Sequence, residues 1–136
     1  TYAHLHRVPL TGIRFFTVYG PWGRPDMAAF LFTEAILEGR PIRVFNHGKM
    51  ARDFTFIDDA VKGLLGALDC PPPVSRSPED SPPHRVYHIG HNRPEPPRKY
   101  IKGIEPAQQD FGYDPATPIE VGLPRFVAWY REHYGV

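Results

Sequence analysis

The spacing of apolar residues changes between a two-residue and a helical period several times along the chain. Alternating apolar positions, many of them aromatic, predict a strand from Gly12 to Val18. A helical pattern follows, with Asp26 as the expected N-cap and Gly39 at the end. Its expected inner face consists of Ala28, Leu31, Phe32, Ala35 and Ile36.

Short strands and a further helix continue this alternation. Two strands are predicted at Ile42 to Phe45 and at Arg52 to Phe56, joined by an Asn-His-Gly turn. Asp58 is expected to cap a helix, and Val86 to Ile89 is predicted to be another strand. The apolar stripe of that helix is Val61, Leu64, Leu65 and Leu68.

The last helix has the clearest local signal. Thr117-Pro118-Ile119-Glu120 is a capping box with proline at the first helical position. Pro124 is expected to kink this helix or to delay its start. The predicted stripe is Ile119, Leu123, Phe126, Val127 and Tyr130.

Strands that alternate with helices indicate an α/β fold with a small mixed sheet. Three or four short strands leave bare sheet edges and an uncovered face. We therefore expect this sheet to pack against a larger structural unit.

Composition excludes several classes of function. The 136 residues are 41% hydrophobic, enough for one globular domain, and a net charge of +1 gives no argument for nucleic-acid binding. No apolar run is long enough to span a membrane. The single Cys70 excludes an internal disulfide and fits a reducing compartment, so we expect a cytoplasmic location. The histidines lack the spacing of a metal site.

Prolines mark one connection. Six of the seventeen prolines lie between residues 70 and 84. Such a stretch forms neither a helix nor a central strand, and we expect an exposed, mobile loop. A proline-recognition motif is the less favoured alternative.

Two arginines near strand ends suggest an anionic ligand. Arg24 follows a Gly-Pro-Trp-Gly loop, where it could hold a carboxylate or phosphate, or pair with Asp26 or Glu34 on the surface. Arg52 precedes an apolar strand, where it could bind a phosphate or pair with a neighbouring aspartate. The Thr17 hydroxyl could meet a substrate oxygen, or Thr17 could simply suit a strand.

The stretches that contain these arginines also resemble a known protein family. Arg14 to Pro25 and Arg52 to Asp59, supported by His88-Ile89-Gly90 and Asp110 to Tyr113, resemble the extended short-chain dehydrogenases/reductases. Within that family they look like the NAD-dependent epimerase/dehydratase group, and most like UDP-glucuronate 4-epimerases. In such enzymes a Rossmann domain holds NAD and a smaller C-terminal portion binds the UDP-sugar.

The resemblance implies roles for seven residues. Phe15 and Phe16 would lie by the nicotinamide, and Thr17 and Arg24 would hold the sugar carboxylate. Val44 and Phe45 would border the uracil, and Arg52 would bind the diphosphate. The full-length enzyme would be a homodimer.

The sequence departs from the family pattern in two places. It contains neither a Tyr-x-x-x-Lys pair nor a glycine-rich dinucleotide loop. We therefore expect residues 1–136 to be the C-terminal UDP-sugar-binding portion, inactive alone, with the Rossmann half absent. Relatives also carry a longer segment near residues 105–110. The alternatives are a nucleotide-sugar dehydratase or decarboxylase of the same family, or a catalytically dead binding module.

Overall fold

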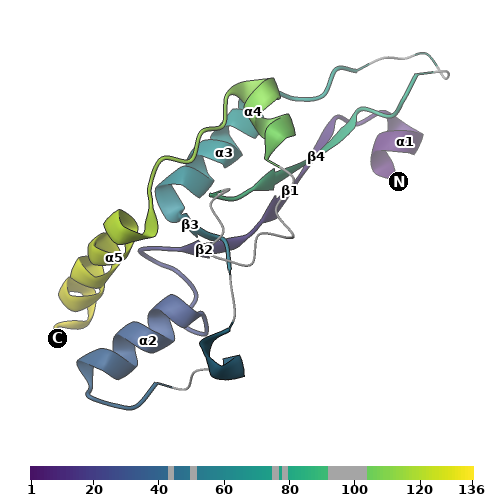
Figure 1. Ribbon diagram of the computed structural model, residues 1–136. Coiled ribbons are helices and arrows are strands. Elements are labelled where there is room, and N and C mark those ends of the chain that lie inside the picture. Colours follow the sequence, from purple (N-terminus) through teal and green to yellow (C-terminus); the bar gives the residue numbers. More distant parts are fainter. Residues whose placement is uncertain (43–44, 50–51, 75–76, 78–79, 92–103) are drawn as a thin grey trace.

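The computed structural model describes residues 1–42, 45–49, 52–74, 77, 80–91 and 104–136. Helices and strands alternate along it, so the predicted α/β class is confirmed (Figure 1). The elements are α1 (Tyr2–His6), β1 (Leu10–Phe15), β2 (Thr17–Tyr19), α2 (Ala28–Leu37), the 3-10 helix η1 (Phe45–Gly48), β3 (Phe54–Phe56), α3 (Ile57–Asp69), β4 (His84–Ile89), α4 (Glu105–Phe111) and α5 (Ile119–Tyr134).

The described strands form two parallel pairs, where one small mixed sheet was expected. β1 pairs with β4, from Leu10 opposite His84 to Phe15 opposite Ile89. β2 pairs with β3, and Thr17 lies opposite Phe54. Parallel neighbours need long crossover connections, which α2 and α3 supply here.

The predicted strand from Gly12 to Val18 is divided at Phe16. The Phe16 N–H donates to the carbonyl of Ile89 (3.1 Å), whereas the Thr17 N–H donates to the carbonyl of Asp53 (3.1 Å). The chain therefore changes its strand partner within one residue. Alternation could not reveal this change, because the backbone stays extended on both sides of it.

Gly90 allows three segments to meet at this change of partner. A Cβ at residue 90 would overlap both the ring of Phe16 and the carboxylate of Asp53. Asp53 is buried, and its Oδ2 accepts a hydrogen bond from the His91 N–H at 3.0 Å. The missing side chain thus lets the ends of β1 and β4 approach the start of β3.

α3 is apolar on two faces, and the face with small residues is buried. Ala60, Gly63 and Ala67 are buried, and a Cβ at Gly63 would lie 2.8 Å from the Ile89 side chain. The predicted stripe is not the packed face, because small residues let the helix lie closer to β4. Its members Val61, Leu64, Leu65 and Leu68 are 42% to 72% exposed.

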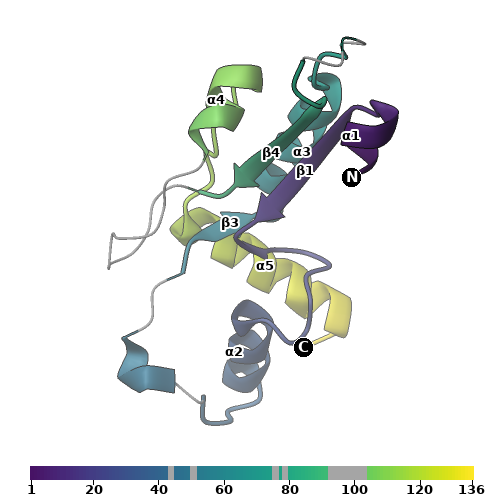
Figure 2. The ribbon, with the colours of Figure 1, turned by 90° about the vertical axis from the view of Figure 1, so that its right-hand side faces the viewer.

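α2 and α5 lie side by side in both views and share a second core (Figures 1 and 2). Phe30 of α2 packs against Phe126 and Tyr130 of α5, with ring centroids 5.1 and 5.5 Å away. Phe126 and Tyr130 were predicted to face inward, and this is confirmed. The prediction for α2 was wrong for three exposed residues, Leu31, Phe32 and Ile36.

The start of α5 is held by α3 instead of by a capping box. Pro118 is the N-cap and makes no side-chain cap. The Thr117 N–H donates to Oδ2 of the fully buried Asp59 at 2.8 Å, so Asp59 joins the two helices. α5 begins before Pro124, so this proline does not delay its start.

The strand predicted from Ile42 to Phe45 is not formed at Phe45, which begins η1. Asn46 and His47 have φ angles of 49° and 51°, in the left-handed region, so the chain turns there as the Asn-His-Gly signal predicted. Val44 lies outside the described residues, and β3 begins at Phe54, two residues later than predicted.

The described part of the proline-rich segment has no helix or strand. The Arg7 guanidinium donates to the carbonyls of Ser77 (3.0 Å), Asp80 (2.9 Å) and Ser81 (3.3 Å), which ties this segment to α1. In the described part of the chain, no helix is long and apolar enough to cross a membrane. No three His, Cys, Asp or Glu residues gather for a metal there.

Candidate functional site

One cavity of about 470 Å³ lies between the end of β1, the loop after β2, and α3. Three of the predicted site residues line it: Phe15, Phe16 and Arg24. The α3 wall consists of Ile57, Ala60, Val61 and Leu64. A guanidinium beside apolar walls suits a ligand with one charged and one apolar part.

Local backbone geometry brings Arg24 back toward Phe15 and Phe16. β2 is only three residues long, and the Gly23 N–H donates to the carbonyl of Gly20 at 3.1 Å, which closes a tight turn. Gly20 has a φ of 139°, a conformation that disfavours a side chain. The Gly/Pro loop therefore places Arg24 beside the strand end that carries Phe15 and Phe16.

Arg24 pairs with Asp26, as the surface alternative predicted. Nε donates to Oδ1 at 3.0 Å and Nη2 donates to Oδ2 at 2.5 Å. This contact uses one edge of the guanidinium and leaves N–H groups of Nη1 and Nη2 directed elsewhere. An Arg24 held in this way can still bind a second carboxylate end-on.

The same ion pair corrects the prediction for the start of α2. Its N-cap is Met27 and not Asp26, because the Asp26 carboxylate is bound to Arg24. The hydrogen bond from Arg24 also lowers the pKa of the Asp26 carboxyl below its ordinary value. Asp26 is therefore an anion at neutral pH, fixed beside the cavity.

Thr17 and Arg52 are not among the described residues that line this cavity. Thr17 is half-buried and lies opposite Phe54, next to the junction at Asp53. Arg52 is exposed, before the start of β3, whereas Arg24 follows the end of β2. Since the two strands are parallel, Arg52 precedes the pair at the end opposite to the one where the chain leaves β2 toward Arg24.

Two further predicted residues receive little structural description. Val44 lies outside the described residues, and Phe45 is described only as the first residue of η1. Their predicted place beside a uracil ring therefore stays a prediction.

Two buried tyrosines, Tyr19 and Tyr113, have raised pKa values. Burial, together with the nearby carboxylate of Asp59, raises the pKa of Tyr19 to about 12. Burial also raises the pKa of Tyr113, whose hydroxyl donates to the carbonyl of Gly90 at 3.1 Å. Neither phenol is an anion near neutral pH, so neither can act as a general base there.

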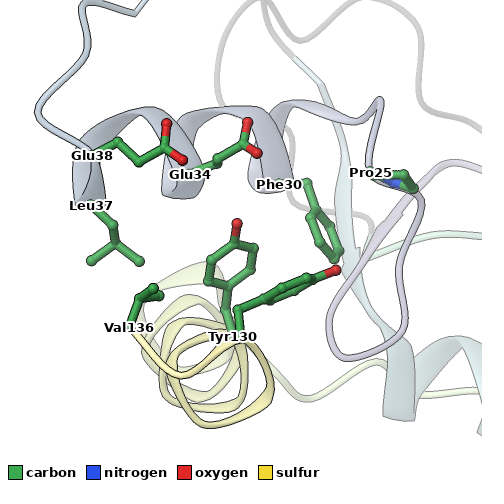
Figure 3. Close-up of a pocket in the computed structure, with 8 residues that line it drawn as sticks. Pro25, Phe30, Glu34, Leu37, Glu38, Tyr130 and Val136 are labelled. Atoms are coloured by element: carbon green, nitrogen blue, oxygen red, sulfur yellow. The ribbon is translucent and has the colours of Figure 1, made fainter.

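A second hollow of about 300 Å³ lies between α2 and the end of α5 (Figure 3). Phe30, Tyr130 and Leu37 form its apolar wall, and Glu34 and Glu38 lie on its α2 side. Arg40 pairs with both carboxylates, at 3.1 Å for Glu34. This hollow includes none of the predicted site residues.

Sequence reasoning missed several residues at the main cavity. Trp22 and Met27 line it beside Arg24. Trp22 is 75% exposed with a φ of 62°, an unusual combination for a bulky residue. A tryptophan inside a Gly/Pro loop was the available signal. Asp53 and Gly90 are not among the described residues that line the cavity, and their contacts join residues far apart in the chain, which local patterns do not predict.

The chain is similar to known proteins over nearly its whole length. UDP-glucuronate 4-epimerase 2 of Arabidopsis thaliana is 42% identical over 168 residues, which cover 98% of this chain and 39% of that protein. A protein of Escherichia coli O111:H-, described as an uncharacterized 37.6 kDa protein, is 40% identical and covers 100% of this chain and 51% of its own length. The chain thus spans about half or less of these relatives.

A solved structure shares the fold. UDP-glucuronic acid 4-epimerase from Bacillus cereus, in complex with UDP-glucuronic acid and NAD, superposes with a TM-score of 0.80 at 25% identity. The match covers 98% of this chain and 48% of that one. Residues 1–90 match the family model described as the NAD dependent epimerase/dehydratase family. On these grounds, the chain belongs to the NAD-dependent epimerase/dehydratase family.

Proposed function

We propose that this chain is the C-terminal UDP-sugar-binding portion of an NAD-dependent nucleotide-sugar epimerase that interconverts UDP-glucuronate and UDP-galacturonate. The observation that carries the proposal is the cavity that collects Arg24, Phe15 and Phe16. The relative from Arabidopsis thaliana named UDP-glucuronate 4-epimerase 2 supports it, as does the B. cereus enzyme that holds UDP-glucuronic acid and NAD.

Arg24 gives the site its preference for a uronate. A uronate carries a carboxylate that a neutral hexose lacks, and the free edge of the Arg24 guanidinium can bind it with two hydrogen bonds. Thr17 would assist at the strand, and Arg52 would bind the diphosphate. Val44 and Phe45 would border the uracil.

The end of β1 suits the nicotinamide of NAD. The Phe15 side chain is 49% exposed and, with Phe16, offers apolar rings to the cavity. Such rings can cover one face of a planar heterocycle. When bound, NAD would supply hydride removal and return at C4 of the sugar, while the two phenylalanines would exclude water from that face.

The uncovered face of α3 supports a larger enzyme around this portion. Its exposed Val61, Leu64, Leu65 and Leu68 form a wide apolar stripe, which a soluble domain normally buries against another surface. We propose that a Rossmann half covers the stripe in the full-length protein. We further propose that the full-length protein is a homodimer in the cytoplasm, as the family resemblance implied for the dimer and the composition for the location.

A catalytically dead binding module is the second candidate. None of the seven tyrosines has a lysine four residues later, so residues 1–136 do not contain the catalytic Tyr-x-x-x-Lys pair of the family. A dehydratase or decarboxylase on the same scaffold would use the same anion contacts. The residues next to the tyrosine of the Tyr-x-x-x-Lys pair would distinguish an epimerase from a dehydratase or decarboxylase.

Calorimetric titration of the 136-residue chain tests the proposal. UDP-glucuronate and UDP-galacturonate are expected to bind more tightly than UDP-glucose, because only the uronates reach Arg24. Equal affinities for all three would remove the uronate assignment. No binding of any UDP-sugar would refute the proposed binding function itself.

A further inference from the structure

The side chain of Trp22, in the Gly/Pro loop, packs against two aromatic rings of α5, those of Trp129 and His133. Its ring lies 4.7 Å from that of His133, nearly perpendicular, and 5.4 Å from that of Trp129. His133 in turn stacks on Trp129, with centroids 5.0 Å apart and planes 11° from parallel. These three residues form an aromatic clasp between the loop and α5.

The α5 side of the clasp is anchored in the second core. Trp129 stacks on Phe126 at 5.9 Å, and Phe126 is fully buried. Trp129 also contacts Phe30 of α2 at 6.0 Å. The clasp therefore connects the loop to the packed pair of helices α2 and α5.

The loop side of the clasp needs such an anchor. Trp22 has a positive φ, which costs energy for a bulky side chain and persists only where surrounding contacts hold it. Arg24 follows two residues later, and both side chains line the main cavity. A shift of Trp22 would therefore move the guanidinium of Arg24.

We propose that Trp129 and His133 are positioning residues: through Trp22 they fix the loop that presents Arg24, and so set how strongly the cavity binds a sugar carboxylate. The choice of ligand rests on the proposed function. The clasp itself rests on ring geometry alone. It gives residues at the far end of α5 control over the anion contact, although they do not line the cavity.

Circular dichroism can observe the clasp directly. The chain has two tryptophans, and both belong to the clasp, so their close indoles should give an exciton couplet in the far ultraviolet. His133→Ala is expected to weaken this couplet. His133→Phe keeps a ring and should preserve it, as should Glu132→Ala, which removes an exposed neighbour on the same helix.

Nuclear magnetic resonance follows the effect to Arg24. In His133→Ala, the Trp22 indole and Arg24 Nε–H signals should both move, while Glu132→Ala leaves them in place. Trp22→Leu removes the ring on the loop side of the clasp and leaves the sequence of α5 unchanged. This variant should also move the Arg24 signal, and it serves as the test if His133→Ala fails to fold. Unchanged Arg24 signals in folded His133→Ala or Trp22→Leu would overturn the proposal.

Calorimetry then separates the clasp from the proposed function. His133→Ala should weaken UDP-glucuronate binding roughly two- to tenfold, the range expected for a lost aromatic pair, with little change for UDP-glucose. His133→Phe should restore the parent affinity. Equal weakening for both sugars would contradict a role through Arg24. A parent chain that binds neither sugar would refute the proposed function, and the spectra would still decide the clasp.

Discussion

The carboxylate of Asp53 accepts a hydrogen bond from the backbone N–H of His91, with Oδ2 and N separated by 3.0 Å. Asp53 precedes β3 and His91 follows β4, so one buried side chain joins the two parallel pairs. Between them Gly90 lies against both Phe16 and Asp53. The strand junction beside the cavity therefore depends on a residue with no side chain.

Gly90→Ala is expected to destabilise the chain by about 1–3 kcal/mol, because the added methyl overlaps the Phe16 ring and the Asp53 carboxylate. Urea unfolding followed by circular dichroism measures the loss. Gly12→Ala is the matched control, since a Cβ there meets its nearest neighbour, Val86, at an ordinary 3.5 Å. Equal stability of the two variants would show that the junction can relax.

The Asp26 carboxyl should titrate below its ordinary range, because Arg24 donates hydrogen bonds to its charged form. A carboxyl whose pKa is lower in the folded state stabilises the fold above its unfolded pKa, and this contribution is lost as pH falls through the folded pKa. The carboxyl carbon signal of Asp26, followed by nuclear magnetic resonance from neutral to acidic pH, gives the midpoint. Arg24→Gln should raise that midpoint toward the ordinary value, and an unaltered midpoint would mean that the pair does not form in solution.

Arg24 and Arg52 should affect two sugars differently in an enzyme completed with the N-terminal half of a relative. Arg24→Ala is expected to lower use of UDP-glucuronate tens-fold or more, the effect of roughly 2–5 kcal/mol from a lost charged partner, and to spare UDP-glucose. Arg52→Ala should weaken both sugars alike, because both carry a diphosphate. Steady-state kinetics on both substrates makes the comparison. Equal losses from Arg24→Ala would remove the basis for a uronate enzyme.

The 136-residue chain alone is expected to show no epimerase activity. Proton transfer needs a base, and the two described tyrosines with strongly raised pKa values, Tyr19 and Tyr113, are buried. Incubation with UDP-glucuronate and NAD, followed by chromatography of the sugar nucleotides, tests this. Formation of UDP-galacturonate above a buffer blank would contradict it.

The first internal cut by proteinase K is expected between residues 70 and 84, where six prolines and little apolar periodicity leave the backbone accessible. Arg7→Ala should speed this cut roughly two- to tenfold, because it removes hydrogen bonds to three carbonyls of the segment. Arg131→Ala removes an equal charge at the other end of the chain and should leave the rate unchanged. An earlier cut between residues 42 and 56 would refute the assignment of the exposed loop.

The sequence by itself determined the α/β class, the positions of α2, α3 and α5, and the Gly/Pro loop that carries Arg24. These features depend on local spacing and turn chemistry, which act within a few residues. It also pointed to Phe15, Phe16 and Arg24, and the structure brings all three to one cavity. The roles predicted for Thr17 and Arg52 still await their tests.

Only the tertiary structure decided which apolar face each helix buries and where each strand changes partner. α3 packs through Ala60 and Gly63 instead of its leucines, because close approach to Ile89 favours small residues over large ones. Asp26 leaves the N-cap for Arg24, and Phe16 divides one predicted strand into two. In each case the deciding partner is fixed by folded geometry, which periodicity along a single chain cannot contain.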